Sequence, residues 1–438
     1  MPYLLNLVYL VLLVVALPWL VVQSVRTGKY RQGWGPKLFG LVPKRRGRAR
    51  CIWLHAVSLG EMSLIGSLVA ELTRRHPDFD LVISTTTLTG RGLAKARYPQ
   101  HTVFYCPLDF TWAVRRAIAR IRPDLLLLAE LELWPNLIAA ARRSGAKVAI
   151  VNGRLSDRST RGYRRVGPLA RRMLANIDLV AAQSRQSADR FLELGARSDV
   201  VHVTGSLKFD GAQTDRGNPE TKRLRALAGF EPDDVVFLAG STQDPEERLA
   251  IEAYKKLAPA HPRLRLVIVP RHPERFDAVA RLLAASGLVW EKRSQWRASG
   301  GNRMVRVLLV DRVGELGALW GCAAIAYVGG SMGRRQGQNM IEPAAYGAAV
   351  SFGPKTRNFR DVVTALLDAN AAQVVHDGAE LTAFVRRCLE EPKFPRQLGE
   401  RAAQVVASQL GATRRTADLL DVLLQDGQCS TRDRRTAA

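Results

Sequence analysis

The sequence predicts an α/β protein with two doubly wound parallel sheets behind an amino-terminal apolar segment. Three observations support this fold class. The chain has 438 residues, enough for two globular domains, and 47% of them are hydrophobic. From residue 51 onward, short runs rich in Val, Ile and Leu alternate with helical patterns. The alternation breaks once, at 209–222, where Gly, Asn, Pro and Asp gather as they do in linkers.

The first 25 residues are predicted to form a membrane anchor. The run 3–22 has no charged side chain and is long enough to span a hydrocarbon core of about 30 Å. It lacks the basic start and the clear cleavage site of a signal peptide. Basic residues follow it at 26–50 and none precede it, so the positive-inside rule places the rest of the chain in the cytoplasm. The basic juxtamembrane segment 26–50 is either a solvated collar or a site for lipid phosphate.

The first domain is expected at 51–208. Its candidate strands are apolar without alternation, as expected of strands buried on both faces. They are 51–57, 81–85, 102–106, 124–129, 147–152, 178–183 and 200–205, with helical patterns such as 61–75 and 110–121 between them.

A second domain is expected at 223–425, after the linker 209–222. A long helical stretch near 395–425 closes this domain, and 426–438 is predicted to be a disordered tail. The candidate strands are 235–240, 264–269, 306–310, 324–328, 349–352 and 372–376.

The charge of the chain favours an anionic partner. Lys and Arg total 65 against 40 Asp and Glu, which leaves a formal net charge of +25. A phosphorylated substrate, an anionic membrane face or a nucleic acid would suit this excess. Nucleic acid is the less favoured of these, because the basic residues lack the interleaved aromatic side chains of single-strand platforms. The five cysteines are scattered without a C-x-x-C pair, which favours a reducing compartment.

Polar residues follow several strands of the first domain, at the edge where such sheets bind ligands. Glu61 lies at a helix start, where it either accepts a proton from a hydroxyl or merely caps the helix. Glu130 and Glu132 follow the fourth strand, and packing does not explain two acids there. Lys208 lies just beyond the last strand. We interpret Glu130, Glu132 and Lys208 as functional, whereas the position of Glu61 alone favours a helix cap.

The second domain carries weaker signals of anion binding. Gly240-Ser241-Thr242 and Gly329-Gly330-Ser331 end two strands, and Arg271 follows a third. Glu342, near a helix start, either contacts a ribose or caps the helix. No phosphate-loop, dinucleotide-binding or zinc-protease motif occurs. The pair Asp78 and Asp80 has D-x-D spacing but lies on the wrong side of the sheet, so no metal site is predicted.

Taken together, these segments resemble the transferases of 3-deoxy-D-manno-oct-2-ulosonic acid (Kdo) in lipopolysaccharide synthesis. The resemblance follows the family order from the anchor to about residue 360. The runs that carry it are LHAVSLGE (54–61), ELELWPN (130–136), NGRLSDRS (152–159), TGSLKFD (204–210), VPRHPERF (269–276), GELGALWG (314–321), GGS (329–331) and NMIEPAA (339–345).

The resemblance implies the GT-B fold, in which two Rossmann-like domains flank a cleft. It implies transfer of Kdo from CMP-Kdo to the glucosamine disaccharide of an anionic lipid A precursor (lipid IVA), without cofactor or metal, at the cytoplasmic side of the inner membrane. It also implies that Glu61 is the catalytic base and that Glu130 and Lys208 stabilise the transition state. The residues matched to CMP binding are Pro270, Arg271, Val313, Gly314, Glu315, Asn339, Met340, Ile341 and Glu342.

Two stretches depart from the family pattern. The family usually has His and Gly after the Gly-Ser-Thr run, where this chain has Gln243, Asp244 and Pro245. It usually has Gly-His-Asn-Pro where this chain has Gln338 and Met340 on either side of the Asn. Two alternatives therefore stay open: a membrane-surface transferase with another nonulosonic acid donor or acceptor, and a non-catalytic paralogue that binds anionic lipid.

Overall fold

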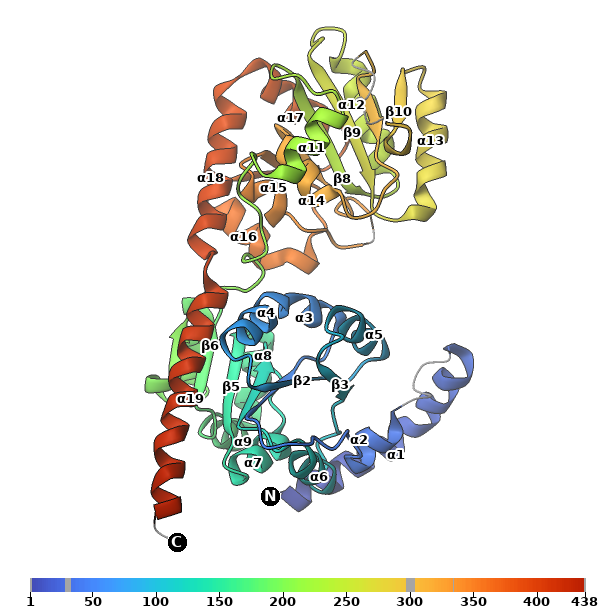
Figure 1. Cartoon of the computed structure of the whole chain (residues 1–438). Coiled ribbons are helices and arrows are strands. Elements are labelled where there is room, and N and C mark those ends of the chain that lie inside the picture. Colours follow the sequence, from blue (N-terminus) through green and yellow to red (C-terminus); the bar gives the residue numbers. More distant parts are fainter. Residues whose placement is uncertain (1, 28–32, 297–303, 334, 437–438) are drawn as a thin grey trace. The chain divides into compact units, whose positions relative to one another are not determined.

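The computed structural model describes residues 2–27, 33–296, 304–333 and 335–436. The chain folds into two compact units (Figure 1). Unit 1 comprises Met1–Gly211 and Leu410–Ala438, and unit 2 comprises Ala212–Gln409. The two predicted doubly wound α/β domains are confirmed, one in each unit.

Unit 1 contains a seven-stranded sheet in the order β3-β2-β1-β4-β5-β6-β7. All neighbouring strands are parallel. The seven predicted strands of the first domain are present within a few residues of their predicted bounds. These strands are β1 (Cys51–His55), β2 (Asp80–Thr85), β3 (Thr102–Tyr105), β4 (Leu125–Ala129), β5 (Lys147–Gly153), β6 (Leu179–Ala182) and β7 (Val201–Val203).

Helices cover both faces of this sheet, which explains why its strands are apolar throughout. On β1, Trp53 faces one buried cluster while Ile52 and Leu54 face the other. The first cluster includes α6 (Thr111–Ile121), α7 (Pro135–Arg143), α9 (Gly167–Leu174) and α10 (Arg185–Glu193). The second includes α3 (Leu59–Leu64), α4 (Gly66–Arg75), α5 (Leu88–Arg97) and α19 (Ala412–Thr436).

Unit 2 repeats the architecture with the strand order β10-β11-β9-β8-β12-β13-β14, again parallel. The short strand β10 (Trp290–Lys292) was not predicted, because its three residues carry no apolar run. The other strands are β8 (Val235–Thr242), β9 (Leu264–Pro270), β11 (Val307–Leu309), β12 (Ile325–Val328), β13 (Ala349–Phe352) and β14 (Ala372–Val374).

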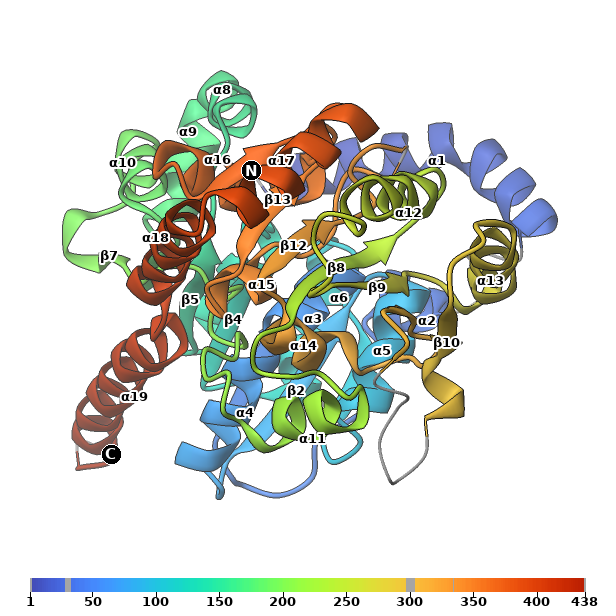
Figure 2. The same ribbon diagram turned by 90° about the horizontal axis from the view of Figure 1, so that it is seen from above.

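The helices of unit 2 form a layer on each face of its sheet. In Figure 2, α12 (Glu246–Leu257) and α17 (Gly378–Glu390) lie on one face. On the other face lie α11 (Pro219–Leu227), α14 (Leu316–Leu319) and α15 (Ile341–Ala345). The remaining helices of the unit are α13 (Phe276–Ala285), α16 (Arg360–Asp368) and α18 (Lys393–Gln409).

The boundary of the second domain differs from the prediction of 223–425. The helical stretch near 395–425 is broken between α18 and α19, where Gly411 adopts a left-handed conformation with φ 85°. Beyond the break, α19 packs along α4, β5 and β6 of unit 1 (Figure 1). Its Leu420 and Leu424 are buried there, which assigns residues from 410 onward to unit 1.

Two smaller expectations also differ from the structure. The predicted linker 209–222 overlaps α11, which begins at Pro219 after Asn218 caps it through the backbone N–H of Thr221. The predicted disordered tail 426–438 largely continues α19, because a helix that has begun extends at little further cost.

One face of helix α1 (Pro2–Thr27) packs against α6 within unit 1. The side-chain amide of Asn6 donates to Thr111 Oγ1 at 2.7 Å, and its oxygen accepts the Thr111 backbone N–H at 3.0 Å. The other faces expose apolar side chains such as Val11 and Val15. Over the described ranges, no helix reaches the length and apolarity required to cross a membrane. The predicted spanning anchor is therefore not confirmed.

The basic segment 26–50 is partly built into unit 1. Arg45 pairs with Asp80 at 2.7 Å and donates to the backbone oxygens of Ile121 and Ala49. Helix α2 (Trp34–Phe39) packs on α6. Residues 28–32 of the predicted collar lie outside the described residues.

The carboxylate of Asp210 caps α19 by accepting the backbone N–H groups of Gly411, Ala412 and Thr413. We expect Asp210→Ala to destabilise unit 1 by about 1–2 kcal/mol, because the cap and its charge at the helix N-terminus are both lost. Urea denaturation would measure the change. The exposed Asp189→Ala in α10 is the control and should change stability by less than about 0.5 kcal/mol. Equal stability of the two variants would contradict a role of Asp210 in holding α19.

Candidate active site

The candidate active site of unit 1 lies at the carboxyl ends of β1 and β4. These two strands are neighbours, and the chain proceeds from them to opposite sides of the sheet. Open α/β sheets bind ligands at such a switch point. Glu61 follows β1 in the first turn of α3, and Glu130 follows β4 directly. The structure therefore brings two of the predicted catalytic residues to the same place.

Glu61 makes the capping contacts that the sequence left open as an alternative. Ser58 is the N-cap of α3, and its Oγ accepts the Glu61 backbone N–H at 3.2 Å. In return, Glu61 Oε1 accepts the Ser58 hydroxyl and Oε2 accepts the Val57 backbone N–H, both at 2.8 Å. These contacts fix the carboxylate at the sheet edge. Each carboxylate oxygen has a second lone pair, so the group can still accept a proton.

The turn between β4 and α7 holds the other two acids. Glu130 has a left-handed backbone with φ 55°, which costs about 1–3 kcal/mol for a non-glycine residue. Its backbone N–H donates to Val151 O at 3.0 Å. Strain of this kind is retained where the surrounding structure imposes it, often at functional sites.

Glu132 is a member of the site that the sequence did not assign to a role. Burial raises the pKa of its carboxyl to about 7, and the neighbouring charges of Glu61 and Glu130 act in the same direction. The Trp134 indole N–H donates to Glu132 Oε2 at 2.7 Å, which opposes the shift. Because Glu61 and Glu130 perturb Glu132, the three carboxyls form one electrostatic cluster. The position of Glu132, two residues after Glu130, was the feature of the sequence that pointed to it.

Asp109 positions the whole turn and was not predicted. Its buried carboxylate accepts the backbone N–H groups of Asn136 and Leu137 at 3.0 and 2.8 Å, which caps α7. The Asn136 side chain donates to Asp109 O at 2.6 Å, and Tyr9 of α1 donates its hydroxyl to the same carboxylate at 3.2 Å. Burial raises the pKa of Asp109 to about 6, against the effect of these donors.

His55 lies beside the cluster but is not a suitable base. It is fully buried, and its ring meets Trp134 edge to face with 5.8 Å between the centroids. Nδ1 lies 2.9 Å from Ser84 Oγ. Burial lowers the pKa of His55 to about 4, so the neutral imidazole is only a weak proton acceptor.

Lys208 lies in the turn after β7, as predicted. The preceding residue, Leu207, is buried and donates its backbone N–H to Asn152 Oδ1 at 3.0 Å. Asn152 itself has a left-handed backbone with φ 54° at the carboxyl end of β5. The Lys208 turn is thus fixed to the same edge of the sheet as the three acids.

In unit 2 the corresponding switch point lies at β8 and β12. Arg271 follows β9, beside β8. Burial raises the pKa of Glu342, and this effect is opposed by the Asn339 side chain, which donates to Glu342 Oε1 at 3.0 Å, and by the positive charge of Arg271. The structure therefore brings Arg271, Asn339 and Glu342 together.

The other residues matched to CMP binding differ in their exposure. Met340 and Ile341 are buried in the core, so only their backbones can reach a ligand. Val313 is 77% exposed, and Gly314 after it has φ 98°. Glu315 forms a bidentate ion pair with Arg293, with N–O distances of 2.7 and 2.8 Å. Pro270 ends β9 and is buried.

The buried carboxylate of Glu246, which was not predicted, accepts hydrogen bonds from backbone amides of the loops at this switch point. It accepts the backbone N–H groups of Gly330, Ser331 and Met332 at 2.7–3.0 Å, and that of Gln243 at 2.9 Å. These amides are thus already hydrogen-bonded. The loops approach so closely that a Cβ on Gly329 would lie 2.6 Å from the Thr242 Cα.

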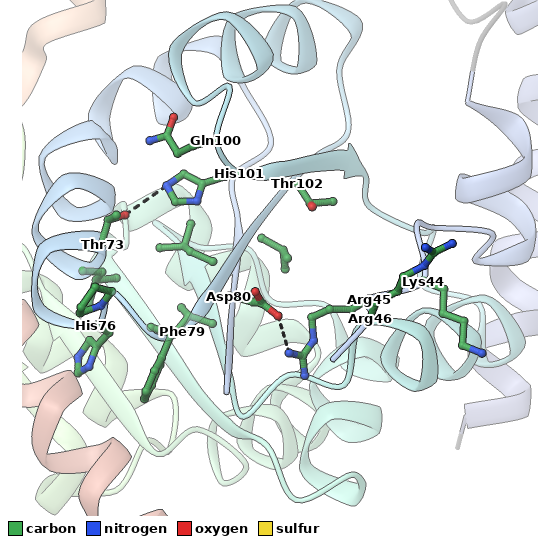
Figure 3. A pocket seen from close by; sticks show the side chains of 15 residues that line it. Lys44, Arg45, Arg46, Thr73, His76, Phe79, Asp80, Gln100, His101 and Thr102 are labelled. Atoms are coloured by element: carbon green, nitrogen blue, oxygen red, sulfur yellow. Dashed lines mark hydrogen bonds and ion pairs between the residues drawn. The ribbon is translucent and has the colours of Figure 1, made fainter. Parts of the chain in front are cut away.

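A separate basic cavity of about 440 Å³ lies at the opposite edge of the first sheet (Figure 3). It opens at the amino ends of β1, β2 and β3, and Lys44, Arg45 and Arg46 line one side. Because ligands of such sheets bind at the carboxyl ends, this cavity is distinct from the candidate site. Within the ranges described, no group of three or more His, Cys, Asp or Glu side chains is arranged to hold a metal ion.

Comparison with known proteins gives consistent matches along the chain. A family model described as 3-deoxy-D-manno-octulosonic-acid transferase (kdotransferase) matches residues 32–211. The 3-deoxy-D-manno-octulosonic acid transferase of Bordetella pertussis is 36% identical over 414 residues, which cover 92% of this chain and 95% of that protein. The protein with the same description from Haemophilus influenzae is 32% identical over 409 residues, covering 92% of this chain and 94% of that protein.

Among solved structures, the UDP-GlcNAc 2-epimerase of Neisseria meningitidis bound to UDP-GlcNAc has a TM-score of 0.55. It is 13% identical, and the match covers 84% of this chain and 99% of that one. At this identity the similarity shows the fold alone.

The raised pKa of Glu132 gives a prediction for stability. Between the ordinary pKa and about 7, the folded protein holds a proton that the unfolded chain releases, so stability falls as the pH rises through this window. We expect the free energy of unfolding of Glu132→Gln to rise by about 1–3 kcal/mol relative to that of the unsubstituted protein when the pH is raised from 5 to 8. Urea denaturation of both proteins at pH 5 and at pH 8 would measure this difference. The exposed Glu193→Gln is the control, and the same pH dependence in both variants would contradict a neutral Glu132.

Proposed function

This chain belongs to the family of 3-deoxy-D-manno-octulosonic acid (Kdo) transferases, and on that premise we propose that it transfers Kdo from CMP-Kdo to lipid IVA, with Glu61 as the general base. It is a glycosyltransferase whose family acts in lipopolysaccharide synthesis. The observation that carries the proposal is the carboxylate cluster at the β1–β4 switch point, because an acceptor hydroxyl needs a base there.

Glu61 is suited to take the proton from the acceptor hydroxyl. The hydrogen bonds from the Val57 backbone N–H and the Ser58 hydroxyl hold its carboxylate in one orientation. As the proton moves to Glu61, the acceptor oxygen forms a bond to the anomeric carbon of Kdo. The bond from that carbon to the phosphate oxygen breaks, and CMP leaves with the electron pair.

The other charged residues stabilise the charges that develop on the sugar and on the departing phosphate in this step. An oxocarbenium-like sugar is favoured by the negative charge of Glu130. The departing phosphate is favoured by a cation, and Lys208 is the candidate in unit 1. Within unit 2, Arg271, Asn339 and Glu342 are the candidates for binding the nucleotide. The reaction as proposed uses no cofactor.

We further propose that α1 anchors the enzyme to the inner membrane, with both units on the cytoplasmic side. The exposed apolar side chains of α1 support membrane binding. The arginines of α8 (Asp157–Arg165) and α9 support an anionic lipid acceptor. Those that are exposed are Arg158, Arg161, Arg164, Arg165, Arg171 and Arg172.

A different nonulosonic acid donor is the second candidate, and it rests on the departures from the family pattern. Gln243 donates its backbone N–H to Glu246, and the Gln338 side chain lies 3.1 Å from the Cβ position of Gly330. Both departures thus lie at the β8–β12 switch point, where a change would alter donor choice.

The base is tested with CMP-Kdo, generated in situ, and tetra-acylated lipid IVA, followed by mass spectrometry of the lipid. We expect Glu61→Gln to lower the transfer rate by about 10²–10⁴-fold, because the proton acceptor is lost while the side chain keeps its shape. Ser58→Ala is the matched control. It removes the cap at a cost of about 1 kcal/mol and leaves the Glu61 carboxylate in place, so transfer should fall only a few-fold.

Equal loss in the two variants would show that Glu61 acts only as a cap. Transfer from another CMP-linked nonulosonic acid, with none from CMP-Kdo, would establish the second candidate. Absence of transfer from either donor by a folded protein would favour the non-catalytic lipid-binding alternative.

Membrane binding is tested by flotation with vesicles of phosphatidylglycerol and phosphatidylethanolamine. Val11 and Val15 lie on one exposed face of α1. We expect Val11→Asp with Val15→Asp to weaken binding by about tenfold per residue, since each valine contributes roughly 1.5 kcal/mol when buried in the membrane. Leu192→Asp, at an exposed position of α10, is the control. Unchanged flotation of the double variant would contradict anchoring through α1.

A further inference from the structure

An apolar pocket connects α1 to the turn that carries the acidic cluster. It has a volume of about 320 Å³, within the range of roughly 300–1,000 Å³ that is typical of small-molecule sites. Leu12 and Leu13 of α1 form one side of the pocket. The opposite side comes from Leu108 and Phe110 before α6, and from Leu133 and Trp134 before α7.

The pocket presents a mainly apolar surface to a ligand, although Asp109 forms part of its lining. Both Asp109 oxygens already accept hydrogen bonds, from Asn136, Leu137 and the Tyr9 hydroxyl. A polar group whose hydrogen bonds are made does not require water or a polar ligand. A hydrocarbon chain therefore meets no unsatisfied partner from Asp109.

The mouth of the pocket continues into the exposed apolar face of α1. Leu12 is 59% exposed while it lines the pocket, and its neighbours Val8 and Val11 are also exposed. An apolar chain that lies along α1 can thus contact the pocket lining through Leu12. Two polar contacts keep α1 in place beside the opening, the Asn6–Thr111 pair and the Tyr9–Asp109 hydrogen bond.

One residue of the pocket lining also contacts the candidate active site. Trp134 lines the pocket and donates its indole N–H to Glu132. Glu132 in turn is electrostatically coupled to Glu61 and Glu130. A ligand whose apolar part fills the pocket can therefore extend toward the turn that carries Glu132.

We propose that this pocket binds one acyl chain of the lipid acceptor and so directs the sugar hydroxyl of that acceptor to Glu61. The proposal rests on the proposed function and names a subsite of it. The apolar lining suits a hydrocarbon chain, and the acids of the adjacent turn suit a hydroxyl-bearing sugar attached to that chain.

The kinetic test compares tetra-acylated lipid IVA in detergent micelles with its fully deacylated disaccharide phosphate. Leu108→Trp places a larger side chain in the pocket, and Leu192→Trp on the exposed face of α10 is the matched control. We expect the ratio of kcat/KM for the acylated over the deacylated acceptor to fall by about tenfold in Leu108→Trp, because two or so methylene groups lose their site. The ratio should stay unchanged in Leu192→Trp.

A second readout does not depend on transfer. A diazirine-labelled fatty acid in micelles is photolysed with the full chain, and the labelled peptides are identified by mass spectrometry. We expect label at Leu12, Leu13 and Leu133 in the unsubstituted protein, and its loss in Leu108→Trp. Should Leu108→Trp not fold, as judged by circular dichroism, Leu12→Gln at the exposed mouth replaces it in both tests.

The outcomes separate this inference from the proposed function. Transfer to both acceptors with an unchanged ratio, and no label in the pocket, overturns the acyl subsite and leaves the transferase intact. Label in the pocket without transfer to either acceptor overturns the proposed function. A fallen ratio with pocket label establishes the subsite.

Discussion

The carboxylate of Asp109 is the contact on which the geometry of the candidate site depends. It caps α7 and thereby fixes the carboxyl end of the turn that carries Glu130 and Glu132. The same carboxylate accepts a hydrogen bond from the Tyr9 hydroxyl, so Asp109 holds both the amino-terminal helix and the acidic turn. Burying a carboxylate is costly unless its oxygens are hydrogen-bonded, and here the donors come from the elements that must be aligned. These hydrogen bonds therefore position α1 and the acidic turn as well as stabilise them.

The site combines structural and chemical roles in the same groups. Glu61 caps a helix and, in the proposed reaction, also accepts a proton, because a carboxylate can accept two hydrogen bonds and still offer a lone pair. Glu246 shows the other extreme, since four backbone donors and the Tyr327 hydroxyl leave it little capacity for a ligand. Both are acids near a helix start. Their surroundings, rather than their residue type, separate a reactive group from a structural one.

The sequence predicted both sheets and placed Glu61, Glu130 and Lys208 at strand ends, because buried parallel strands leave a strong apolar pattern and their carboxyl ends share one edge. It missed β10, whose three residues are too few to leave a pattern. It also missed Asp109 and Glu246, because their structural roles depend on hydrogen bonds to residues that are distant in sequence. The break at Gly411 was overlooked because a single glycine within a helical pattern is often tolerated. The folded-state pKa of Glu132 depends on burial, which local sequence does not report.

The return of α19 to unit 1 has a consequence for the order in which the protein is made. Unit 2 is inserted within unit 1, since residues 212–409 separate its two segments. A ribosome therefore completes the inserted unit before it has synthesised the helix that covers β5 and β6. Domains commonly fold as units in the order of their synthesis. Here the amino-terminal sheet is synthesised well before α19, so part of its apolar face has no covering helix until unit 2 has been made.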